Sequence, residues 1–285
     1  MIAKAALAIA MVWLPTSAAL AFGQEGHSII GEIANRRLTA QALTAVENAL
    51  GRGHSLAAVG SWADDVRDAR PTTYNWHFVD LPLAADAYDA NRDCKLVPAK
   101  GDCIIAELGR LKKELSCAPT NEAKAEALKF TVHFVGDVHQ PLHTVLEKRG
   151  GNGVDVTSMI KGNTCRPTAN DPNKCVTASN LHQMWDGVLI TRFVWNWGSY
   201  VDRLEEGWLK SPEAANAEQG SIQDWVEQSH KEARIAWDAV PADTKLTDDY
   251  LSAMVPILDR QLGRGGLRLA RFLNEAYANT DCSGQ

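Results

Sequence analysis

The stretch Lys129-Phe-Thr-Val-His-Phe-Val-Gly-Asp-Val-His-Gln-Pro-Leu-His143 places titratable side chains inside an apolar helical pattern. His133 and Asp137 are four residues apart, so they share one face of a helix. Thr120, followed by an acidic residue and an alanine-rich run, predicts where this helix begins. Pro141 predicts where it ends, because proline lacks the amide hydrogen and its ring clashes with the preceding turn.

A second segment, Asn180-Leu-His-Gln-Met-Trp-Asp186, repeats the same spacing with His182 and Asp186. Helical proteins build metal sites from imidazoles and carboxylates on facing helices, and this donor set suits Zn²⁺. One such pair alone is more often a solvated or capping pair. Two pairs, with the isolated His143 just beyond the proline, favour a metal site.

Three further segments place an acid or a histidine among apolar neighbours, and they are candidate partners of the two pairs. An unpartnered carboxylate in an apolar helix, such as Asp64, is costly to bury. The ordinary alternative for His77 is a satisfied core histidine, and for His27 it is a histidine at a helix start. The segments are Ser61-Trp-Ala-Asp-Asp-Val-Arg67, Trp76-His-Phe-Val-Asp80 and Phe22-Gly-Gln-Glu-Gly-His27.

The N-terminus has the pattern of a secretory signal peptide covering residues 1–21. Lys4 precedes an apolar run over 5–14, and a small-residue segment ends at Ala21. The run is too short to cross a bilayer, and no later segment has the pattern of a membrane span. We therefore expect a soluble periplasmic or secreted protein whose mature domain is 22–285, with Phe22 as its first residue. A free amine and the first carbonyl can both bind zinc.

The composition suits a globular exported protein with a large core. Hydrophobic residues make up 45% of the 285, and the formal net charge is −6. This acidic balance argues against a charge-driven nucleic-acid module, but not against a metalloenzyme, whose cations supply positive charge locally. The sequence predicts a single all-α domain, with helices over 40–50, 55–68, 103–117, 120–140, 181–193, 222–239 and 247–277, the last interrupted near Pro256 or Gly263–Gly266.

Two other features interrupt the helical pattern. Residues 154–160 alternate weakly and predict a short strand, and residues 162–179 are polar and predict a surface loop. An even number of cysteines in an exported chain favours disulfides over zinc binding, since no CxxC pair occurs. The spacing favours two local pairs, Cys94–Cys103 and Cys165–Cys175, and leaves a long-range pair, Cys117–Cys282.

Taken in order, these motifs resemble the trinuclear-zinc nucleases of the S-one/P-one type, also called 3′-nucleotidase/nucleases, within the zinc phospholipase C superfamily. The resemblance implies a helical bundle of the phospholipase C and single-strand nuclease type, with a small β-hairpin or irregular loop insert. It covers residues 22–186, while the last hundred residues match only in being helical and containing Trp. The matching segments are Phe22-Gly with Gly26-His27, Trp62-Ala-Asp64, Trp76-His-Phe-Val-Asp80, His133 to His143, Gly150-Gly-Asn152 and Asn180 to Asp186.

The resemblance also implies three Zn²⁺ per chain, arranged as a close pair and one more distant ion. His54, His139 and His230 receive no metal role. One ion of the pair would be held by Asp64, His77, His133 and Asp137. Its neighbour would be held by the Phe22 amine and carbonyl, His27 and the shared Asp137. The third ion would be held by His143, His182 and Asp186.

The implied activity is hydrolysis of phosphodiester bonds in single-stranded DNA and RNA to 5′-nucleotides, together with 3′-nucleotidase activity. A hydroxide between the paired ions would attack phosphorus, while the third ion stabilises the leaving 3′-oxygen. Asp64 and Asp137 belong to this catalytic set. Arg67 would contact the phosphate in a planar bidentate geometry, and its alternative is a surface ion pair with a neighbouring aspartate.

For the base, the resemblance implies Phe78 as a stacking wall, Asp80 as an acceptor of hydrogen bonds from base edges, and Asn152 beside the substrate. The alternative for Phe78 is core packing. The chain departs from the family pattern at two places. Phe22 stands where Trp is usual, and Arg149 stands where a small apolar residue often precedes Gly-Gly-Asn, which puts base stacking there in doubt and adds affinity for phosphate.

Three alternatives remain open at this point. A zinc phospholipase C shares the metal frame, but members of that branch tend to carry Glu where Asp186 stands and some add a membrane-binding domain. A non-catalytic zinc-binding protein would more often have a closed, cysteine-rich site. A metal-free helical export protein is the third.

The expected partners are single-stranded nucleic acid and 3′-nucleotides, with no stable protein partner, no membrane, and a monomeric state.

Overall fold

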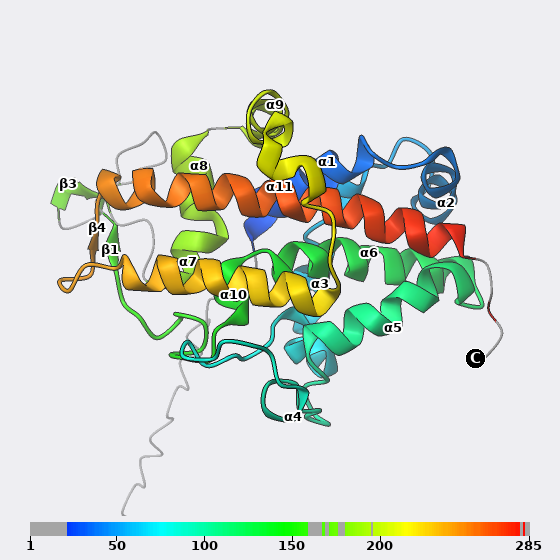
Figure 1. The fold of residues 1–285 in the computed structure, drawn as a ribbon, viewed down its shortest axis with the longest axis horizontal. Helices are drawn as coiled ribbons and strands as arrows, with labels where there is room; N and C mark the ends of the chain where they lie inside the picture. The colour runs from blue at the N-terminus through cyan, green and yellow to red at the C-terminus, as the bar shows by residue number, and fades with distance from the viewer. Residues whose placement is uncertain are drawn as a thin grey trace, which may run out of the picture.

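The computed structural model describes residues 22–158, 167–168, 171–175, 180–194, 196–279 and 282. Within these ranges the chain is all-α, as the sequence predicts, and helices far apart in sequence lie side by side (Figure 1). None of the helices described is long and apolar enough to cross a membrane. The predicted signal peptide, residues 1–21, lies outside the described residues.

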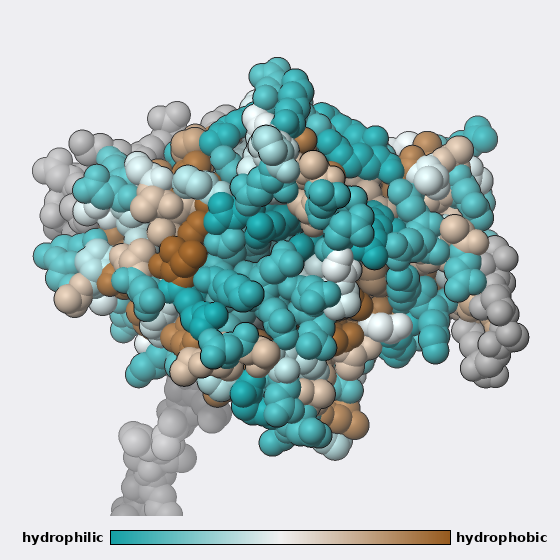
Figure 2. All heavy atoms as spheres, viewed as in Figure 1, coloured by the Kyte–Doolittle hydropathy of each residue, from teal (hydrophilic) through white to brown (hydrophobic). Residues whose placement is uncertain are grey.

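A central helix, α6, runs through the protein and carries the decisive stretch of sequence. It contacts α1, α5 and α11, and much of its surface is buried. α10 and the long α11 cross one face together, and that face is largely hydrophilic (Figures 1 and 2). The main helices are α1 (Gly23–Asn35), α2 (Ala40–Leu50), α5 (Ile104–Cys117), α6 (Asn121–Val138), α9 (Trp197–Glu206), α10 (Ile222–Asp238) and α11 (Asp248–Ala278).

Shorter helical segments connect these elements and carry much of the site. They include one π-helical turn, η4, between α7 and α8, so that residues 181–193 form one continuous helical stretch as predicted. The segments are η1 (Leu56–Val59), α3 (Trp62–Arg67), η2 (Pro71–His77), α4 (Ala90–Asp93), η3 (Pro141–Thr144), α7 (Leu181–Gln183), η4 (Met184–Val188), α8 (Leu189–Phe193), η5 (Trp208–Lys210) and η6 (Pro212–Asn216).

Local capping explains why the sequence pattern locates several helix ends correctly. The side chain of Thr39 accepts a hydrogen bond from the Ala42 amide, and that of Thr120 accepts one from the Ala123 amide. Each bond satisfies an amide that the first turn of a helix otherwise leaves unpaired. At α10, Ser221 and Asp224 form a reciprocal capping box.

Three helix predictions need correction. The helix expected over 55–68 divides into η1 and α3, with Gly60 and Ser61 between them. α11 is continuous through Pro256, so the expected interruption was wrong. The glycines at 263–266 do not break it, because they bring Trp208 and the side chains of α1 against the helix. α1 itself was not expected, and it is held by buried isoleucines, Ile29, Ile30 and Ile33.

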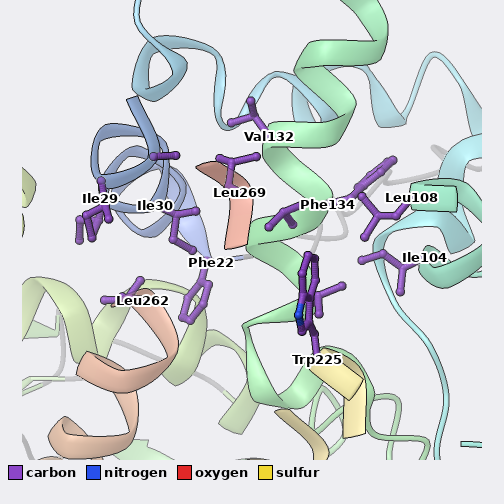
Figure 3. Close-up of a cluster of buried hydrophobic side chains, with 14 of the residues drawn as sticks. Phe22, Ile29, Ile30, Ile104, Leu108, Val132, Phe134, Trp225, Leu262 and Leu269 are labelled. Atoms are coloured by element: carbon purple, nitrogen blue, oxygen red, sulfur yellow. The ribbon is translucent and has the colours of Figure 1, made fainter. Parts of the chain in front are cut away.

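Phe22 is fully buried at the start of α1. Its ring belongs to the same apolar cluster as Ile30 of α1 and Leu262 of α11 (Figure 3). The residue expected to become the mature N-terminus is therefore anchored in the core.

The described strands are few and short. β1 (Thr157–Ser158) pairs in parallel with β4 (Lys245–Leu246), so the strand predicted over 154–160 is present over two residues, with 159–160 outside the described residues. β2 (Pro167–Thr168) pairs antiparallel with β3 (Asp171–Cys175), which agrees with a small hairpin insert; the rest of the loop predicted over 162–179 lies outside the description.

Two of the three expected disulfides are present, Cys94–Cys103 and Cys117–Cys282. The second ties the end of α5 to the C-terminal segment beyond α11. Cys165 lies outside the described residues, so its expected pairing with Cys175 stays a prediction.

The contact between α1 and α11 should not tolerate a side chain at Gly266. A Cβ atom there would overlap the Ile33 side chain, whereas one at the exposed Gly109 of α5 would meet nothing within 4 Å. We expect Gly266→Ala to lower the free energy of unfolding by about 1–3 kcal/mol through overpacking. The control, Gly109→Ala, should raise it by about 0.5–1 kcal/mol through helix propensity. Urea denaturation measures both, and stabilisation by both variants would contradict the tight contact.

Candidate metal centre

Four side chains from three elements converge at the buried side of α6. The Nδ1 of His77, at the end of η2, lies 3.1 Å from Nε2 of His133 and 3.1 Å from Oδ2 of Asp137. Oδ1 of Asp64, in α3, lies 3.6 Å from each of the same two ring nitrogens. The i, i+4 spacing predicted for His133 and Asp137 is confirmed, since their atoms approach to 3.1 Å on one face of α6.

These separations suit a tetrahedral cation. Zinc binds imidazole nitrogen at about 2.0–2.1 Å and carboxylate oxygen at a similar distance, which places neighbouring ligand atoms about 3.3 Å apart. The observed 3.1 and 3.6 Å lie on either side of that value. Ring nitrogens and carboxylate oxygens of His77, His133 and Asp137 therefore already have the spacing that one bound cation requires.

His27 extends this group on the side of α1. Its Nε2 lies 3.4 Å from Oδ1 of Asp137, and its ring stacks on that of His133 with centroids 4.0 Å apart. Asp137 thus faces His77 and His133 with one oxygen and His27 with the other. We call His27, Asp64, His77, His133 and Asp137 the paired cluster, because a shared carboxylate is what two adjacent cations need.

The predicted second group also comes together. His143 in η3, His182 in α7 and Asp186 in η4 place ligand atoms within 4.8 Å of one another, and we call them the outer cluster. The rings of His143 and His182 stack with centroids 5.0 Å apart. Asp186 lies in the π-helical turn, a local widening that is frequent at functional sites.

The two clusters adjoin each other and the N-terminus. Nδ1 of His143 lies 3.7 Å from Oδ1 of Asp137. A Cβ built on Gly23 would lie 2.9 Å from the carbonyl oxygen of Asp186, so the residue after Phe22 packs on the outer cluster. The structure brings the histidine and aspartate candidates into one buried region, with Phe22 beside it.

Backbone carbonyls orient three of the histidines. Nδ1 of His133 lies 2.7 Å from the Gly60 carbonyl, that of His143 lies 2.8 Å from the His77 carbonyl, and that of His182 lies 2.6 Å from the Gly150 carbonyl. A carbonyl only accepts, so Nδ1 carries the hydrogen in each ring. Nε2 is then the atom available to a metal, which is the usual support around metal-binding histidines.

Buried polar atoms without partners provide a test of whether a metal fits here. Buried donors and acceptors are almost always paired in folded proteins. In the described part of the chain, hydrogen-bond partners are lacking at both ring nitrogens of His27, Asp64 Oδ1, His77 Nε2, Asp137 Oδ1, His143 Nε2 and Asp186 Oδ2. Most of these atoms point into the two clusters, and bound cations would satisfy them. The residues present fit zinc.

Cys94 and Cys103 form a further candidate group with Asp102. Because the two sulfurs are bonded to each other, they cannot serve as thiolate ligands. This group is structural.

The pKa values show which ligands are ready to bind a cation. Burial lowers the pKa of His77 to about 4 and that of His182 to about 3, so both imidazoles are neutral at pH 7. Burial opposes the charged form of His133 as well, but Asp137 and Asp64 outweigh it and raise its pKa to about 9. Burial likewise opposes ionisation of Asp137, yet His133 and His143 hold its pKa well below the usual range.

Arg67 is close to the outer cluster. Its guanidinium carbon lies 4.2 Å from the centroid of the Tyr74 ring. Burial is the main cause that lowers the pKa of His143 and His182, and the charge of Arg67 adds to it in both. The guanidinium therefore acts on the metal centre electrostatically.

The proposed base-binding residues Phe78 and Asp80 follow His77 of the paired cluster closely in the chain. Phe78 directly follows His77 and is half-buried, with its ring edge-on to exposed Tyr74 at a centroid distance of 6.0 Å. Asp80 is half-buried too, and burial, with a contribution from Asp93, raises its pKa to about 6. Phe78 is thus only partly covered, unlike a core phenylalanine such as Phe134.

Arg149 and Asn152 belong to a tight turn that supports the outer cluster. Lys148, Arg149, Gly150 and Gly151 all have positive φ. The side chain of Asn152 donates to the Arg149 carbonyl at 2.9 Å. A Cβ on Gly150 would lie 2.5 Å from the Leu142 carbonyl, so only glycine can present its own carbonyl to the ring of His182 here.

Several functional contacts were missed by sequence reasoning. The carbonyls of Gly60, His77 and Gly150 orient ligands, but every residue has a carbonyl and no side-chain pattern marks these. Gln140 was quoted within a motif without a role, yet its amide contacts Asp186. The adjacency of this amide to the predicted ligand segment was the signal available. His139 and His230, which received no metal role, bond to protein groups outside the clusters.

The all-α fold and the two buried histidine–aspartate clusters define a helical protein of the metal-binding class. A family model described as S1/P1 Nuclease matches residues 22–278, and the chain belongs to that family. It is therefore a nuclease, and the resemblance seen in its motifs is confirmed.

Individual relatives agree with this assignment. Endonuclease 2 of Arabidopsis thaliana is 28% identical over 285 residues, covering 90% of each chain. Nuclease S1 of Aspergillus oryzae is 27% identical, covering 89% of this chain and 91% of its own. Nuclease P1 of Penicillium citrinum is 26% identical, covering 90% and 98%. The similarity extends over the C-terminal helices, for which the motifs alone gave little information.

Zinc binding at pH 7 should displace a proton from the paired cluster. His133, with a pKa of about 9, is protonated in the metal-free protein, and its Nε2 must lose that proton to bind a cation. Calorimetric titrations with zinc in buffers of different ionisation enthalpy should show proton release at pH 7. His133 contributes about one proton, which falls toward zero above pH 9, and Asp186, whose pKa burial raises well above its usual range, contributes separately. The variant His133→Gln should release about one proton fewer than the wild type at pH 7. Identical heats in all buffers for the wild type would contradict this assignment.

Proposed function

We propose that this nuclease hydrolyses phosphodiester bonds in single-stranded DNA and RNA with three bound Zn²⁺, releasing 5′-nucleotides, and that it also dephosphorylates 3′-nucleotides. The observation that carries the proposal is the adjacency of the two clusters through Asp137, whose Oδ1 lies 3.4 Å from His27 and 3.7 Å from His143. A phosphate bound beside Asp137 would meet both clusters at once.

The paired cluster would hold two cations and the outer cluster one. Asp64, His77, His133 and Asp137 suit the first, and His27 with Asp137 and the Phe22 main chain suit the second. When bound, zinc ions supply a hydroxide nucleophile at neutral pH and positive charge for phosphate and leaving oxygens. Three carboxylates offset only half of the charge of three Zn²⁺, which leaves a net positive site in an acidic protein.

The substrate phosphate would be oriented by Arg67. Its planar guanidinium matches two phosphate oxygens, and its charge already acts on His143, His182 and Asp186 of the outer cluster. Packing on Tyr74 restricts its orientation, so less side-chain entropy is lost when phosphate binds. No serine or cysteine nucleophile is required.

The base would stack on Phe78 and be bonded by Asp80. An aromatic face accepts any base, which suits an enzyme with little sequence preference. The preference for single strands follows, because a base must leave its stack to reach a half-buried ring beside a buried metal centre. Asn152 would lie beside the substrate and brace the turn that holds His182, and Arg149 of the same turn would add affinity for phosphate.

Export and processing complete the proposal. Removal of residues 1–21 would give Phe22 a free amine next to the outer cluster, where Gly23 already packs. The two disulfides suit an oxidising compartment such as the periplasm or the extracellular medium. We expect a monomer of one domain, 22–285, because both clusters take all their side-chain ligands from one chain.

Metal content and activity of the mature protein starting at Phe22 test the proposal together. We expect about three zinc ions per chain and release of 5′-nucleotides from single-stranded DNA and RNA, both lost on chelation and restored by zinc. Duplex DNA and a phosphatidylcholine analogue serve as comparison substrates. Absence of bound metal would exclude the mechanism, and hydrolysis of the lipid analogue alone would exclude the substrate assignment.

The raised pKa of Asp80 predicts a pH dependence of substrate binding. Below pH 6 the carboxyl takes up a proton and loses its capacity to accept two hydrogen bonds. KM for a single-stranded oligonucleotide, whose phosphodiesters do not titrate near pH 6, should therefore rise about tenfold per pH unit well below pH 6, and Asp80→Asn should remove this dependence.

The pH dependence of stability offers a second test with the variant Asp80→Asn. A carboxyl whose pKa is raised in the folded state contributes stability at low pH that is lost as pH rises through about 6. Asp80→Asn should therefore melt higher than wild type at pH 7 to 8, and at the same temperature near pH 4. A variant that keeps the wild-type KM profile would exclude Asp80 from base recognition.

A further inference from the structure

Gln140 connects the two ligand clusters, although it is not itself a metal ligand. It lies three residues after Asp137, and its backbone N–H donates to the backbone carbonyl of Asp137 at 3.0 Å. Its side chain is fully buried, and Nε2 donates to Oδ1 of Asp186 at 2.7 Å. One residue is thus tied by its backbone to the paired cluster and by its side chain to the outer cluster.

The orientation of this amide is fixed by the chain. The Leu142 backbone N–H donates to Oε1 of Gln140 at 2.6 Å. Because a backbone N–H only donates, the atom it contacts must be the oxygen. The NH₂ group is then forced toward Asp186, and a flipped amide would leave two buried donors facing each other.

The contact fixes the orientation of the Asp186 carboxyl group through a neutral donor. Oδ1 accepts from Gln140 and lies 3.6 Å from Nε2 of His182, while Oδ2 is buried and has no hydrogen-bond partner in the described part of the chain. A lysine or arginine at this place would neutralise the acid and compete with a cation. A neutral amide donor restricts the rotation of the carboxylate and leaves it able to bind metal.

Helix α11 in turn holds the turn that carries Gln140. Gln261 donates from Nε2 to the His139 carbonyl at 3.0 Å and to Ser229 at 2.8 Å. Arg268 donates to Nε2 of His139 at 2.9 Å. The residue just before Gln140 is therefore fixed at its side chain and at its carbonyl by groups that do not touch the metal clusters.

From these contacts we propose that Gln140 is a positioning residue that sets the affinity of the outer cluster for its cation. It acts through Asp186 and does not touch the substrate. The inference rests on the proposed function in so far as the outer cluster must hold a cation of its own.

Two buried glutamines allow a matched test. Gln140→Met removes the donor to Asp186 at similar volume, and Gln261→Met removes an equally buried amide that supports the same turn without touching an acid. Zinc per chain would be measured after dialysis against a zinc buffer, together with the dissociation constant of the weakest site and the melting temperature. We expect Gln140→Met to weaken that site by about 10–100-fold, while Gln261→Met keeps the wild-type zinc content at a lowered melting temperature.

If Gln140→Met does not fold, Gln140→Glu replaces it, since it keeps the size and polarity but turns the donor into an acceptor. Wild-type zinc content and affinity in the Gln140 variant would overturn this inference and leave the proposed function intact. An equal loss of zinc in the Gln140 and Gln261 variants would also overturn it, because Gln140 would then only support the turn. A wild-type protein that holds zinc only in the paired cluster would overturn the inference together with the proposed count of three.

Discussion

The burial of the Asp137 carboxylate determines which side chains must surround it and how the helices that carry them must pack. Its side chain is fully excluded from water, and four imidazoles surround it, those of His27, His77, His133 and His143, at 3.1 to 3.7 Å. A buried charge without partners costs several kcal/mol, so the chain must deliver those rings from α1, η2, α6 and η3 to one point. The packing of helices α1 and α11 against α6 is the means by which that convergence is achieved, and the paired cluster is its result.

What the sequence could predict were interactions between residues close together along the chain. The spacing of His133 and Asp137 predicted one shared face, because a helix brings residues four apart together whatever surrounds it. Thr120 predicted the start of α6 for the same reason, since a cap bonds to an amide three residues away. His27 and Asp64 were only candidate partners from their own segments, and the family resemblance gave them metal roles. The structure places His27 3.4 Å from Asp137, and Asp64 3.6 Å from His77 and His133.

What the sequence could not predict depends on contacts between distant segments. The glycines at 263–266 predict a break when α11 is considered alone, yet they are where Trp208 and the side chains of α1 pack closely, so the helix continues. The carbonyls of Gly60 and Gly150 orient His133 and His182 from segments 73 and 32 residues away. The residue type does not indicate which backbone carbonyl will face a given histidine ring, because that depends on how the distant segments pack in the fold.

The distances along the chain between ligands have a further consequence. His77 and Asp137, which approach to 3.1 Å, are separated by 60 residues, so a cation held between them closes a loop as a covalent bridge would. By the chain-entropy relation used for disulfides, a loop of that length removes about 4 kcal/mol of freedom from the unfolded chain. A cation bound in the paired cluster would thus add a reversible cross-link to the covalent one between Cys117 and Cys282. The protein would then resist proteases while metal is bound and become digestible when the metal is withdrawn.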